Sequence, residues 1–405
     1  MAQEPHRHCM VVHAYYPIGE PRVQREAEAL IDSGYQVDVI CLHAPGEPDY
    51  ANVYGVNIYR LPVRRHKDRG ALVQFLEYLA FFWLALVRLT FLHLRRHYQT
   101  VQTHNPPDFL VFAALGARLM GARIILDLHD LMPEFYASRF KRGMDSWPVR
   151  LMRWQERLAY SFADHVITVT QPWGQTLIER GLPADKCSIV MNVADNKLFD
   201  GTRTEPGPAR RSGFHLFYHG SLTWRYGVDL TLQALACLRH DLPDVYLTIH
   251  GRGDFLGNLQ QLTRELALDD LVDFSTEYLP MERLPALIAS ADLALVPYRC
   301  DVFTGGILPT KLMEYAAMGI PALVARTPAI SAYFDETMVE FFTPENIQEL
   351  AACIRSLYHN RARLDELARN IVKFNQRHNW ASQKAEYIDL VRRLALRQRQ
   401  VLASN

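Results

Sequence analysis

Short apolar runs rich in β-branched residues alternate with segments of helical period along the whole chain, and this alternation limits the folds open to it. Parallel sheets covered by helices on both faces have this pattern, so we predict an α/β fold with doubly wound parallel sheets. The predicted strands of the first half are Met10–His13, Val37–Leu42, Val101–Thr103, Ile124–Leu128, Val166–Thr170 and Ser188–Met191. Those of the second half are His215–Tyr218, Val245–His250, Val272–Ser275, Leu293–Val296 and Ala322–Val324.

A chain of 405 residues is too long for one hydrophobic core, which indicates two domains. Each half starts with a strand, a loop containing glycine and arginine, and a helix. The polar stretch Asp200–Gly213, rich in glycine and proline, favours a hinge around Asn192–Gly213. We predict a first domain over residues 1–195, a second over 196–375, and a helical segment over 376–405 that crosses back to the first. Ligands of open α/β sheets bind at the carboxyl ends of strands, so the substrates are expected in the cleft between two facing sheets.

Charge and cysteine content exclude several classes of protein. Lysine plus arginine equal aspartate plus glutamate at 44 each, so no global field favours nucleic acid, and anions require a local site. The six cysteines are far apart and form no C-x-x-C pair, which favours a reducing cytoplasm. No signal peptide follows Met1, so we expect a cytoplasmic protein.

The segment Leu308–Pro321 has the layout of a nucleotide-binding helix. Pro309 suits a helix start, and the free amides of a first turn attract an anion. Lys311 adds a cation in that turn, and the Glu314 carboxylate, one turn later, can accept two hydroxyl hydrogen bonds from a ribose. The sequence therefore predicts a diphosphate at the helix start and a ribose beside Glu314. Leu308, Thr310, Gly305 and Gly306 complete the predicted donor-binding segment.

This segment resembles the donor-binding helix of family-4 retaining glycosyltransferases of the GT-B fold, in the subgroup that carries a Pro-Ser/Thr-Lys-x-x-Glu-Tyr run. Further blocks are similar to the family in the expected order, and the resemblance covers most of the chain. These blocks are Thr103–Asp108, Leu126–Glu134, His219–Asp229, Ile249–Asp254 and Ala291–Tyr298.

The resemblance implies that Arg225 and Lys311 neutralise the leaving diphosphate. Catalysis of this transfer needs either a metal held by an Asp-x-Asp motif or fixed protein cations, and the sequence has no Asp-x-Asp. No metal and no cofactor are therefore expected besides a UDP- or GDP-sugar donor. We expect Gly251 and Gly253 to permit close approach to the nucleotide, and Tyr278 to lie near its base.

One position departs from the family pattern. Many members have a sugar-binding glutamate eight residues before the ribose-binding one, and Gly306 stands there in this chain. Members with a Pro-Ser/Thr-Lys helix share this difference. Backbone amides of Gly305, Gly306 and Ile307 are expected to bind the sugar instead.

The first half supplies candidates for the acceptor or sugar side. His129 follows the strand Ile124–Leu128 at its carboxyl end, and the resemblance places it near the reacting sugar. Asp130 is a candidate orienting partner, whereas Glu134 is either a site residue or the start of a helix. Asn105 is either a site residue or a turn residue before two prolines. Gly19 and Arg22 resemble the first phosphate-side loop of the family, with one glycine in place of the usual pair, and the resemblance implies that Arg22 faces an acceptor phosphate.

The apolar region around Leu72–Leu94 has two readings. Its apolar core, bounded by Glu77 and Arg88, is shorter than the ~20 residues of a spanning helix, so we expect an interfacial or a buried helix. Basic residues frame it as they would at an anionic membrane surface, which would make the protein peripheral to a membrane. They are Arg64, Arg65, Lys67, Arg69, Arg95 and Arg96.

The hypothesis from the sequence is a metal-independent retaining glycosyltransferase that moves a hexose-type sugar from a nucleotide diphosphate to a glycan or lipid-linked hydroxyl. Cell-envelope polysaccharide or glycolipid synthesis is the expected setting. A nucleotide-sugar epimerase of the same architecture and a non-catalytic sugar-nucleotide-binding partner subunit stay open as alternatives. Neither the donor sugar nor the acceptor follows from the residues.

Overall fold

The chain folds into two compact units in the computed structural model, which describes residues 6–18, 20–65, 70–205, 207, 212–277 and 279–404. Unit 1 comprises Met1–Asn192 and Ala381–Asn405, and unit 2 comprises Val193–Trp380. The chain thus changes unit at 192/193 and at 380/381, where the sequence suggested 195 and 375. Gly19, Lys67, Arg69 and Tyr278, four residues singled out in the sequence, lie outside the described residues.

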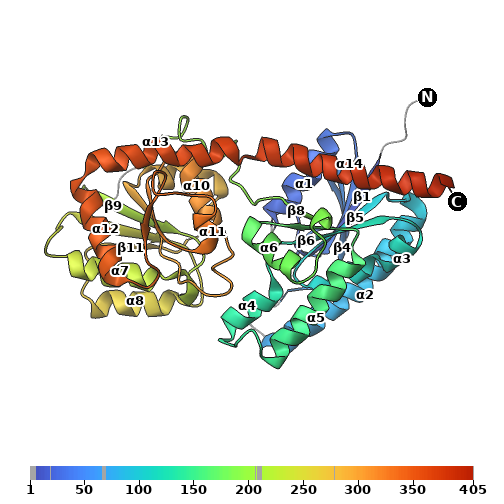
Figure 1. Ribbon diagram of the computed structural model, residues 1–405, viewed down its shortest axis with the longest axis horizontal. Helices are drawn as coiled ribbons and strands as arrows, with labels where there is room; N and C mark the ends of the chain where they lie inside the picture. Colours follow the sequence, from blue (N-terminus) through green and yellow to red (C-terminus); the bar gives the residue numbers. More distant parts are fainter. Residues whose placement is uncertain are drawn as a thin grey trace. The chain divides into compact units, whose positions relative to one another are not determined.

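Unit 1 is built on an eight-stranded sheet with the strand order β3-β4-β2-β1-β5-β6-β7-β8 (Figure 1). All neighbours are parallel except β3 and β4. The strands are β1 (Arg7–Tyr15), β2 (Gln36–Leu42), β3 (Tyr50–Val53), β4 (Val56–Leu61), β5 (Thr100–His104), β6 (Arg123–Leu128), β7 (His165–Thr168) and β8 (Cys187–Ile189).

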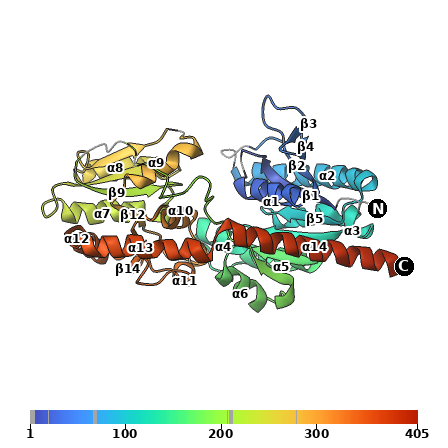
Figure 2. The same ribbon diagram turned by 90° about the horizontal axis from the view of Figure 1, so that it is seen from above.

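Helices from both ends of the chain pack in unit 1. The last helix, α14, lies along this unit and is fixed by buried polar contacts: the Tyr387 hydroxyl donates to Gln102 Oε1 at 2.7 Å, and the Met191 amide donates to Gln383 Oε1 at 2.7 Å (Figures 1 and 2). The α-helices of unit 1 are α1 (Pro21–Asp32), α2 (Gly70–Arg96), α3 (Leu115–Leu119), α4 (Met132–Arg139), α5 (Trp147–Phe162), α6 (Gln171–Glu179) and α14 (Trp380–Ser404). The 3₁₀ helix η1 (Asp108–Ala114) precedes α3.

Unit 2 has a six-stranded parallel sheet with the order β11-β10-β9-β12-β13-β14. Its strands are β9 (Phe214–His219), β10 (Val245–His250), β11 (Val272–Ser275), β12 (Leu293–Val296), β13 (Ala322–Ala325) and β14 (Glu340–Phe342). Its α-helices are α7 (Val228–Leu238), α8 (Leu256–Glu265), α9 (Leu284–Ala289), α10 (Thr310–Met318), α11 (Pro328–Ser331), α12 (Ile347–His359) and α13 (Arg361–Arg377). Two parallel doubly wound sheets confirm the predicted fold class.

Three strands, β3, β4 and β14, escaped the sequence prediction. β4 is largely buried, but the polar residues Asn57 and Arg60 interrupt its apolar run. β3 and β14 are edge strands of four and three residues, and β3 has no fully buried residue. A two-residue turn joins β3 to β4, with positive φ at Tyr54 (51°) and Gly55 (84°). Such turns match the twist of a hairpin but usually carry Asn-Gly or Asp-Gly. Because Tyr54 stands before Gly55, the sequence did not indicate a hairpin here.

The apolar region of the first half forms one long helix, which corrects the length expected for it. α2 runs over 27 residues, and Leu72–Arg96 within it is long and apolar enough to cross a membrane by length and composition. Only 22% of its most apolar window is buried. One stripe of α2 nevertheless packs against unit 1, because Phe81, Ala85 and Leu89 have no exposed surface.

Gly227, which precedes α7 with φ 65°, makes one of the tightest backbone contacts among the described glycines. A Cβ atom there would lie 1.9 Å from the Pro297 carbonyl oxygen, so only glycine fits. We expect Gly227→Ala to destabilise unit 2 by about 2 kcal/mol or more and to lower its melting temperature by about 4–8 °C in calorimetry. Gly257→Ala is the control: its Cβ would meet nothing within 4 Å inside α8, so melting should stay unchanged or rise. Equal melting of both variants would contradict this account.

Candidate active site

The donor-binding segment forms a helix start with polar groups converging behind it. α10 begins at Thr310 directly after Pro309 and ends at Gly319, whose φ is 68°. Leu308 and Pro309 are buried, whereas Thr310 is exposed. The first-turn amides of an α-helix have no intrahelical acceptor and carry the positive end of the helix dipole. In α10 the Leu312 amide donates to the Pro309 carbonyl at 3.0 Å, so the Thr310 and Lys311 amides are the first-turn groups that could bind an anion. Diphosphate binding at this helix start stays a prediction.

Lys311 points from this first turn into the interior of unit 2. Its side-chain amine is buried, has no hydrogen-bond partner, and lies 3.8 Å from the centre of the Tyr218 ring. The rings of Tyr226 and Tyr298 lie 5.3 Å away. Burial lowers the pKa of Lys311 well below its ordinary value, and the nearby Glu314 only partly opposes this. A buried amine without a hydrogen-bond acceptor lowers the stability of the protein. A ligand with an acceptor atom beside Lys311 would supply the missing hydrogen bond.

Glycine makes room for this amine at the end of β9. A Cβ at Gly220 would lie 3.0 Å from Lys311 Nζ, and Gly220 has φ 118°, a conformation that other residues rarely adopt. The Gly220 amide donates to the His250 carbonyl at 3.0 Å, which continues the β9–β10 pairing beyond the strands. The amine is thus held at the carboxyl end of the sheet, where ligands of such sheets bind.

Glu314 lies one turn further along α10 and is mostly buried. Its Oε2 atom lies 3.1 Å from His219 Nε2, but the orientation of the two groups is not that of a hydrogen bond. Both atoms are buried and lack a hydrogen-bond partner. A carboxylate with this spare capacity can accept hydroxyl groups, which fits the predicted ribose contact.

Arg225 lies in the short 3₁₀ helix η3 (Trp224–Tyr226), half-buried, with its guanidinium 5.2 Å from the centre of the Phe303 ring. A second arginine fixes this loop. Arg299 donates to both Asp229 carboxylate oxygens at 2.8 and 2.6 Å, and to the Trp224 carbonyl at 2.6 Å. Arg299, His219 and Tyr218 do not follow from the sequence as site residues, because they contact Asp229, Glu314 and Lys311 from distant segments of the chain.

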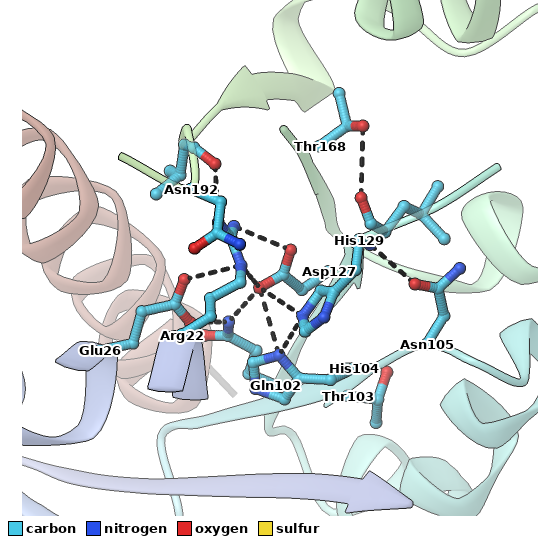
Figure 3. A network of polar contacts seen from close by, with 12 residues as sticks. Arg22, Glu26, Gln102, Thr103, His104, Asn105, Asp127, His129, Thr168 and Asn192 are labelled. Carbon is cyan, nitrogen blue, oxygen red and sulfur yellow. Dashed lines mark hydrogen bonds and ion pairs between the residues drawn. The ribbon is translucent and has the colours of Figure 1, made fainter. Parts of the chain in front are cut away.

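Unit 1 carries a separate buried network at the carboxyl ends of β5 and β6 (Figure 3). Arg22 of α1 donates to both carboxylate oxygens of Asp127, from Nε at 3.1 Å and from Nη2 at 3.0 Å. Its Nη1 donates to the Val190 carbonyl at 2.8 Å, and Glu26 lies 3.2 Å from its Nε. Gln102 donates to Glu26 at 2.8 Å and to Asp127 at 3.1 Å.

The charges of this network perturb one another strongly. Although burial acts in the opposite sense, the Arg22 and His129 charges hold the pKa of Asp127 well below its usual range. Burial raises the pKa of Glu26 to about 7, despite the opposing effect of Arg22. The network thus holds an ionised Asp127 against Arg22 and a Glu26 that readily takes a proton.

Two histidines extend the network toward the surface. His104 Nδ1 lies 3.2 Å from Asp127 Oδ2 and 3.1 Å from His129 Nε2. Burial lowers the pKa of His104 to about 4, so this ring is neutral. The pKa of His129 is raised, because the Asp127 charge outweighs the effect of burial. His129 follows β6 directly, as predicted, and its side chain is 18% exposed, so it can reach a ligand.

His104, Asp127 and His129 form the group of described residues whose ligand atoms could hold a metal, within 4.8 Å of one another. Asp127 is already bound by the Arg22 guanidinium, however, and that fixed positive charge disfavours a divalent cation beside it. The donor set therefore fits a hydrogen-bonded network better than a metal centre.

Two protein-family models match the chain. The family model described as "Glycosyl transferase 4-like domain" matches residues 19–192, and that described as "Glycosyl transferases group 1" matches residues 207–378. Together the two models span most of both units. The chain belongs to the group 1 glycosyltransferase family.

Curated relatives and solved structures agree with the family. A chitobiosyldiphosphodolichol beta-mannosyltransferase of Debaryomyces hansenii is 23% identical over 76% of this chain and 70% of the relative. A GDP-mannose-dependent alpha-(1-6)-phosphatidylinositol monomannoside mannosyltransferase of Mycolicibacterium smegmatis is 36% identical over 25% of this chain and 27% of the relative. The structure of HepE of Anabaena in complex with UDP matches with a TM-score of 0.66 at 16% identity, covering 98% of this chain and all of that one. The fold is therefore GT-B, and the enzyme transfers a sugar from a nucleotide sugar.

Gly251 and Gly253 of the glycosyltransferase are required for backbone packing, whereas the sequence predicted that they approach the nucleotide. A Cβ at Gly251 would lie 1.9 Å from the Gly220 carbonyl oxygen, and a Cβ at Gly253 would lie 2.0 Å from that of Leu222. Both glycines thus let the loops after β9 and β10 pack together. Their approach to a nucleotide stays a prediction.

The expectation that the Gly305 and Gly306 amides bind the sugar is wrong. The Gly305 amide donates to the Asp301 carbonyl at 2.9 Å, and the Gly306 amide donates to the Phe303 carbonyl at 3.1 Å. These two amides are used within their own turn. Gly305 is also confined, because a Cβ there would lie 2.9 Å from the Asp301 carbonyl oxygen.

One further expectation for unit 1 is corrected. Arg22 does not face an acceptor phosphate, because it is buried and its guanidinium is engaged by Asp127, Glu26 and Val190. Of the two alternatives for Glu134, the structure favours the helix start: Glu134 lies buried in the first turn of α4 and pairs with Arg180.

Asn105 fixes the loop that carries His129. Its side-chain oxygen accepts from the His129 amide at 2.7 Å, and its amide nitrogen donates to the Asp130 carbonyl at 2.6 Å and to Asp108 at 2.8 Å. Of the two alternatives for Asn105, the structure favours the loop-forming one. Asp130 joins this contact through its backbone, and its orienting role stays a prediction.

The buried Lys311 amine leads to a prediction about protons. Binding a diphosphate beside it should restore its pKa, so binding at pH 8 should take up protons from solution. Calorimetric titration with UDP and GDP in buffers of different ionisation enthalpy measures this uptake. Lys311→Met should abolish it, and binding enthalpies of the wild type that are independent of the buffer would contradict the account.

The Arg22 network leads to a prediction about stability. Arg22→Ala leaves the Asp127 charge buried without its main partner and should lower the free energy of unfolding by about 3–5 kcal/mol. Lys384→Ala is the matched control, since Lys384 pairs with Asp32 at 2.7 Å on the surface of the same unit and should lose about 1 kcal/mol or less. Urea denaturation of the full chain measures both, and similar losses would refute the structural role of Arg22.

Proposed function

We propose that the chain is a retaining, metal-independent glycosyltransferase that moves a hexose-type sugar from a UDP- or GDP-sugar to an acceptor hydroxyl. The observation that carries the proposal is the Lys311 amine, buried without a partner one turn from the unsatisfied Glu314 carboxylate. A nucleoside diphosphate supplies an anion for the Lys311 amine and a ribose diol for the Glu314 carboxylate.

The leaving diphosphate needs compensation of its charge as the C1–O bond breaks. Lys311, the first turn of α10 and Arg225 are the groups that we propose for this task. Interactions that strengthen as charge develops accelerate the chemical step, whereas those equally strong in the ground state do not. The Phe303 ring beneath Arg225 restricts the guanidinium, which favours this use.

In the proposed mechanism the acceptor hydroxyl attacks C1 on the face from which the diphosphate leaves, and a diphosphate oxygen takes the hydroxyl proton. The C1–O bond to the acceptor forms as the bond to the diphosphate breaks. We assign His129 a hydrogen bond to a hydroxyl of the transferred sugar. Asp127 and His104 orient its ring, which makes them positioning residues.

The acceptor is proposed from the named relatives. Their names include a dolichol-linked disaccharide and a phosphatidylinositol monomannoside as substrates, as well as biosynthesis of amylovoran and of colanic acid. Glycolipid or polysaccharide synthesis is the setting common to these names. We therefore propose a lipid-linked glycan as the acceptor.

A donor screen tests the proposal as a whole. The purified enzyme is incubated with UDP- and GDP-sugars, with and without lipid-linked acceptors, and released nucleotide is measured. Acceptor-dependent release with an unchanged anomeric configuration in the product, read by NMR, supports retaining transfer. Isomerised donor in the absence of acceptor would instead show an epimerase. Binding of UDP or GDP without turnover of any donor would show a non-catalytic sugar-nucleotide-binding subunit.

The two proposed cations give a kinetic prediction. Arg225→Ala and Lys311→Ala should each lower kcat by about 10²-fold or more, with a smaller effect on KM, if they act on developing charge. Steady-state kinetics with the donor found in the screen provides the measurement. Arg264→Ala, which removes an exposed arginine of α8, serves as the control and should turn over normally. Normal kcat in either site variant would remove that residue from the mechanism.

A further inference from the structure

The surface of α5 in unit 1 combines large apolar side chains with arginines. Four apolar residues at helical spacing are exposed, by 77% for Trp147, 53% for Leu151, 59% for Trp154 and 41% for Leu158. Tryptophan and leucine at such exposure are unusual on a protein surrounded only by water. Their common spacing of three and four residues puts them on one stripe of the helix.

Beside this stripe runs a second one made of arginines. Arg150, Arg153 and Arg157 are all exposed, and they share the spacing of three and four residues. Glu156, the acidic residue within α5, is buried and paired with Arg180. The exposed charge of this helix is therefore entirely positive, and the nearest exposed acid, Asp145, precedes the helix.

The arginines border a hollow that suits an anionic group. It has a volume of about 270 Å³ and is lined by Arg150, Arg153, Trp154, Arg157, Tyr160 and Arg180. Arg180 is bound to Glu134 and Glu156, so the remaining three guanidinium groups supply its net charge. Arginine binds phosphate oxygens with two parallel hydrogen bonds, which fits a lipid phosphate group.

α2 also exposes large apolar side chains. Its buried stripe faces unit 1, but Trp83, Val87, Phe91 and Leu94 are 53–62% exposed on another stripe. An apolar groove of about 300 Å³ joins the two helices near their N-terminal ends. Its lining includes Phe75 and Tyr78 of α2, Phe109 of η1, Tyr136 of α4, and Trp147 and Leu151 of α5.

We propose that α5 and α2 together form a docking surface for an anionic phospholipid membrane. Helices that lie in the membrane interface carry tryptophan and leucine for the acyl boundary and arginine for the headgroups, and α5 has both. The proposal places the helices on the membrane, not across it: α5 has 16 residues, and one stripe of α2 is buried against its own unit.

The charge of the surface decides between a membrane and a second copy of the chain. Two copies packed through α5 would bring their arginine stripes together without acidic partners. A leaflet with anionic headgroups neutralises the same stripes, while its acyl chains cover the tryptophans. The docking surface does not depend on the proposed donor chemistry, because membrane binding needs neither donor nor acceptor.

Vesicle co-sedimentation of the full chain tests the docking surface. Vesicles of phosphatidylcholine are compared with vesicles that also contain phosphatidylglycerol, at low and at high salt. We expect binding to the anionic vesicles that weakens with salt. Each arginine contributes about 1 kcal/mol near such a surface, so the triple variant R150Q/R153Q/R157Q should bind about 100-fold more weakly. The double variant W147S/W154S should bind at least 10-fold more weakly at either salt concentration.

The control variants R264Q and M281S remove an exposed arginine and an exposed apolar side chain from unit 2 and should bind as the wild type does. Melting temperature and UDP or GDP binding of all variants show that they remain folded. Equal binding of wild type and both α5 variants would overturn the proposal. So would a stable dimer, seen by light scattering, that W147S/W154S dissociates, because it would make the surface a contact between two copies.

Discussion

The central feature of unit 2 of this glycosyltransferase is the Lys311 amine, which is buried away from water. Lys311 enters the interior from the first turn of α10, and its amine lies against the Tyr218 ring and Gly220 without a hydrogen-bond acceptor. This arrangement costs stability, since a buried amine forgoes its hydration or its proton. A protein that tolerates such a cost at the carboxyl end of a parallel sheet gains from it when a ligand arrives. An anion bound beside Lys311, as proposed, would account for the neighbouring Gly220 and the helix start, and a bound ribose would account for the unpartnered Glu314 Oε2 atom.

The two units treat buried charge in opposite ways. In unit 1 the Arg22 guanidinium is matched by Asp127, Glu26 and a backbone carbonyl, and this network ties α1 to β5, β6 and the segment after β8. These charged groups stabilise the fold, and only His129 extends from Asp127 toward the surface. In unit 2 the charges of Lys311 and Glu314 stay incompletely satisfied. This difference separates residues that maintain structure from residues available to substrate, and it removes Arg22 and Glu134 from the second group.

The sequence predicts local features well, and features made by distant segments poorly. Strands such as Val245–His250 and Leu293–Val296 were predicted to the residue, because a buried strand of a parallel sheet is a largely continuous apolar run. The helix start at Pro309 and the strand-end position of His129 followed from equally local rules. His219 and Arg299 act through partners about 70 to 95 residues away, and no periodicity reveals such pairs. The exposure of α2 and α5 also depends on which faces the fold leaves uncovered, which a helical pattern alone does not determine.

A crystal structure of the enzyme with bound UDP or GDP would show directly whether Lys311 and Glu314 bind the nucleotide. The account predicts diphosphate oxygens within hydrogen-bond distance of Lys311 Nζ and of the first-turn amides of α10, with the ribose hydroxyls on Glu314. A bound nucleotide that leaves the Lys311 amine without a phosphate oxygen, or that places its ribose away from Glu314, would contradict the account.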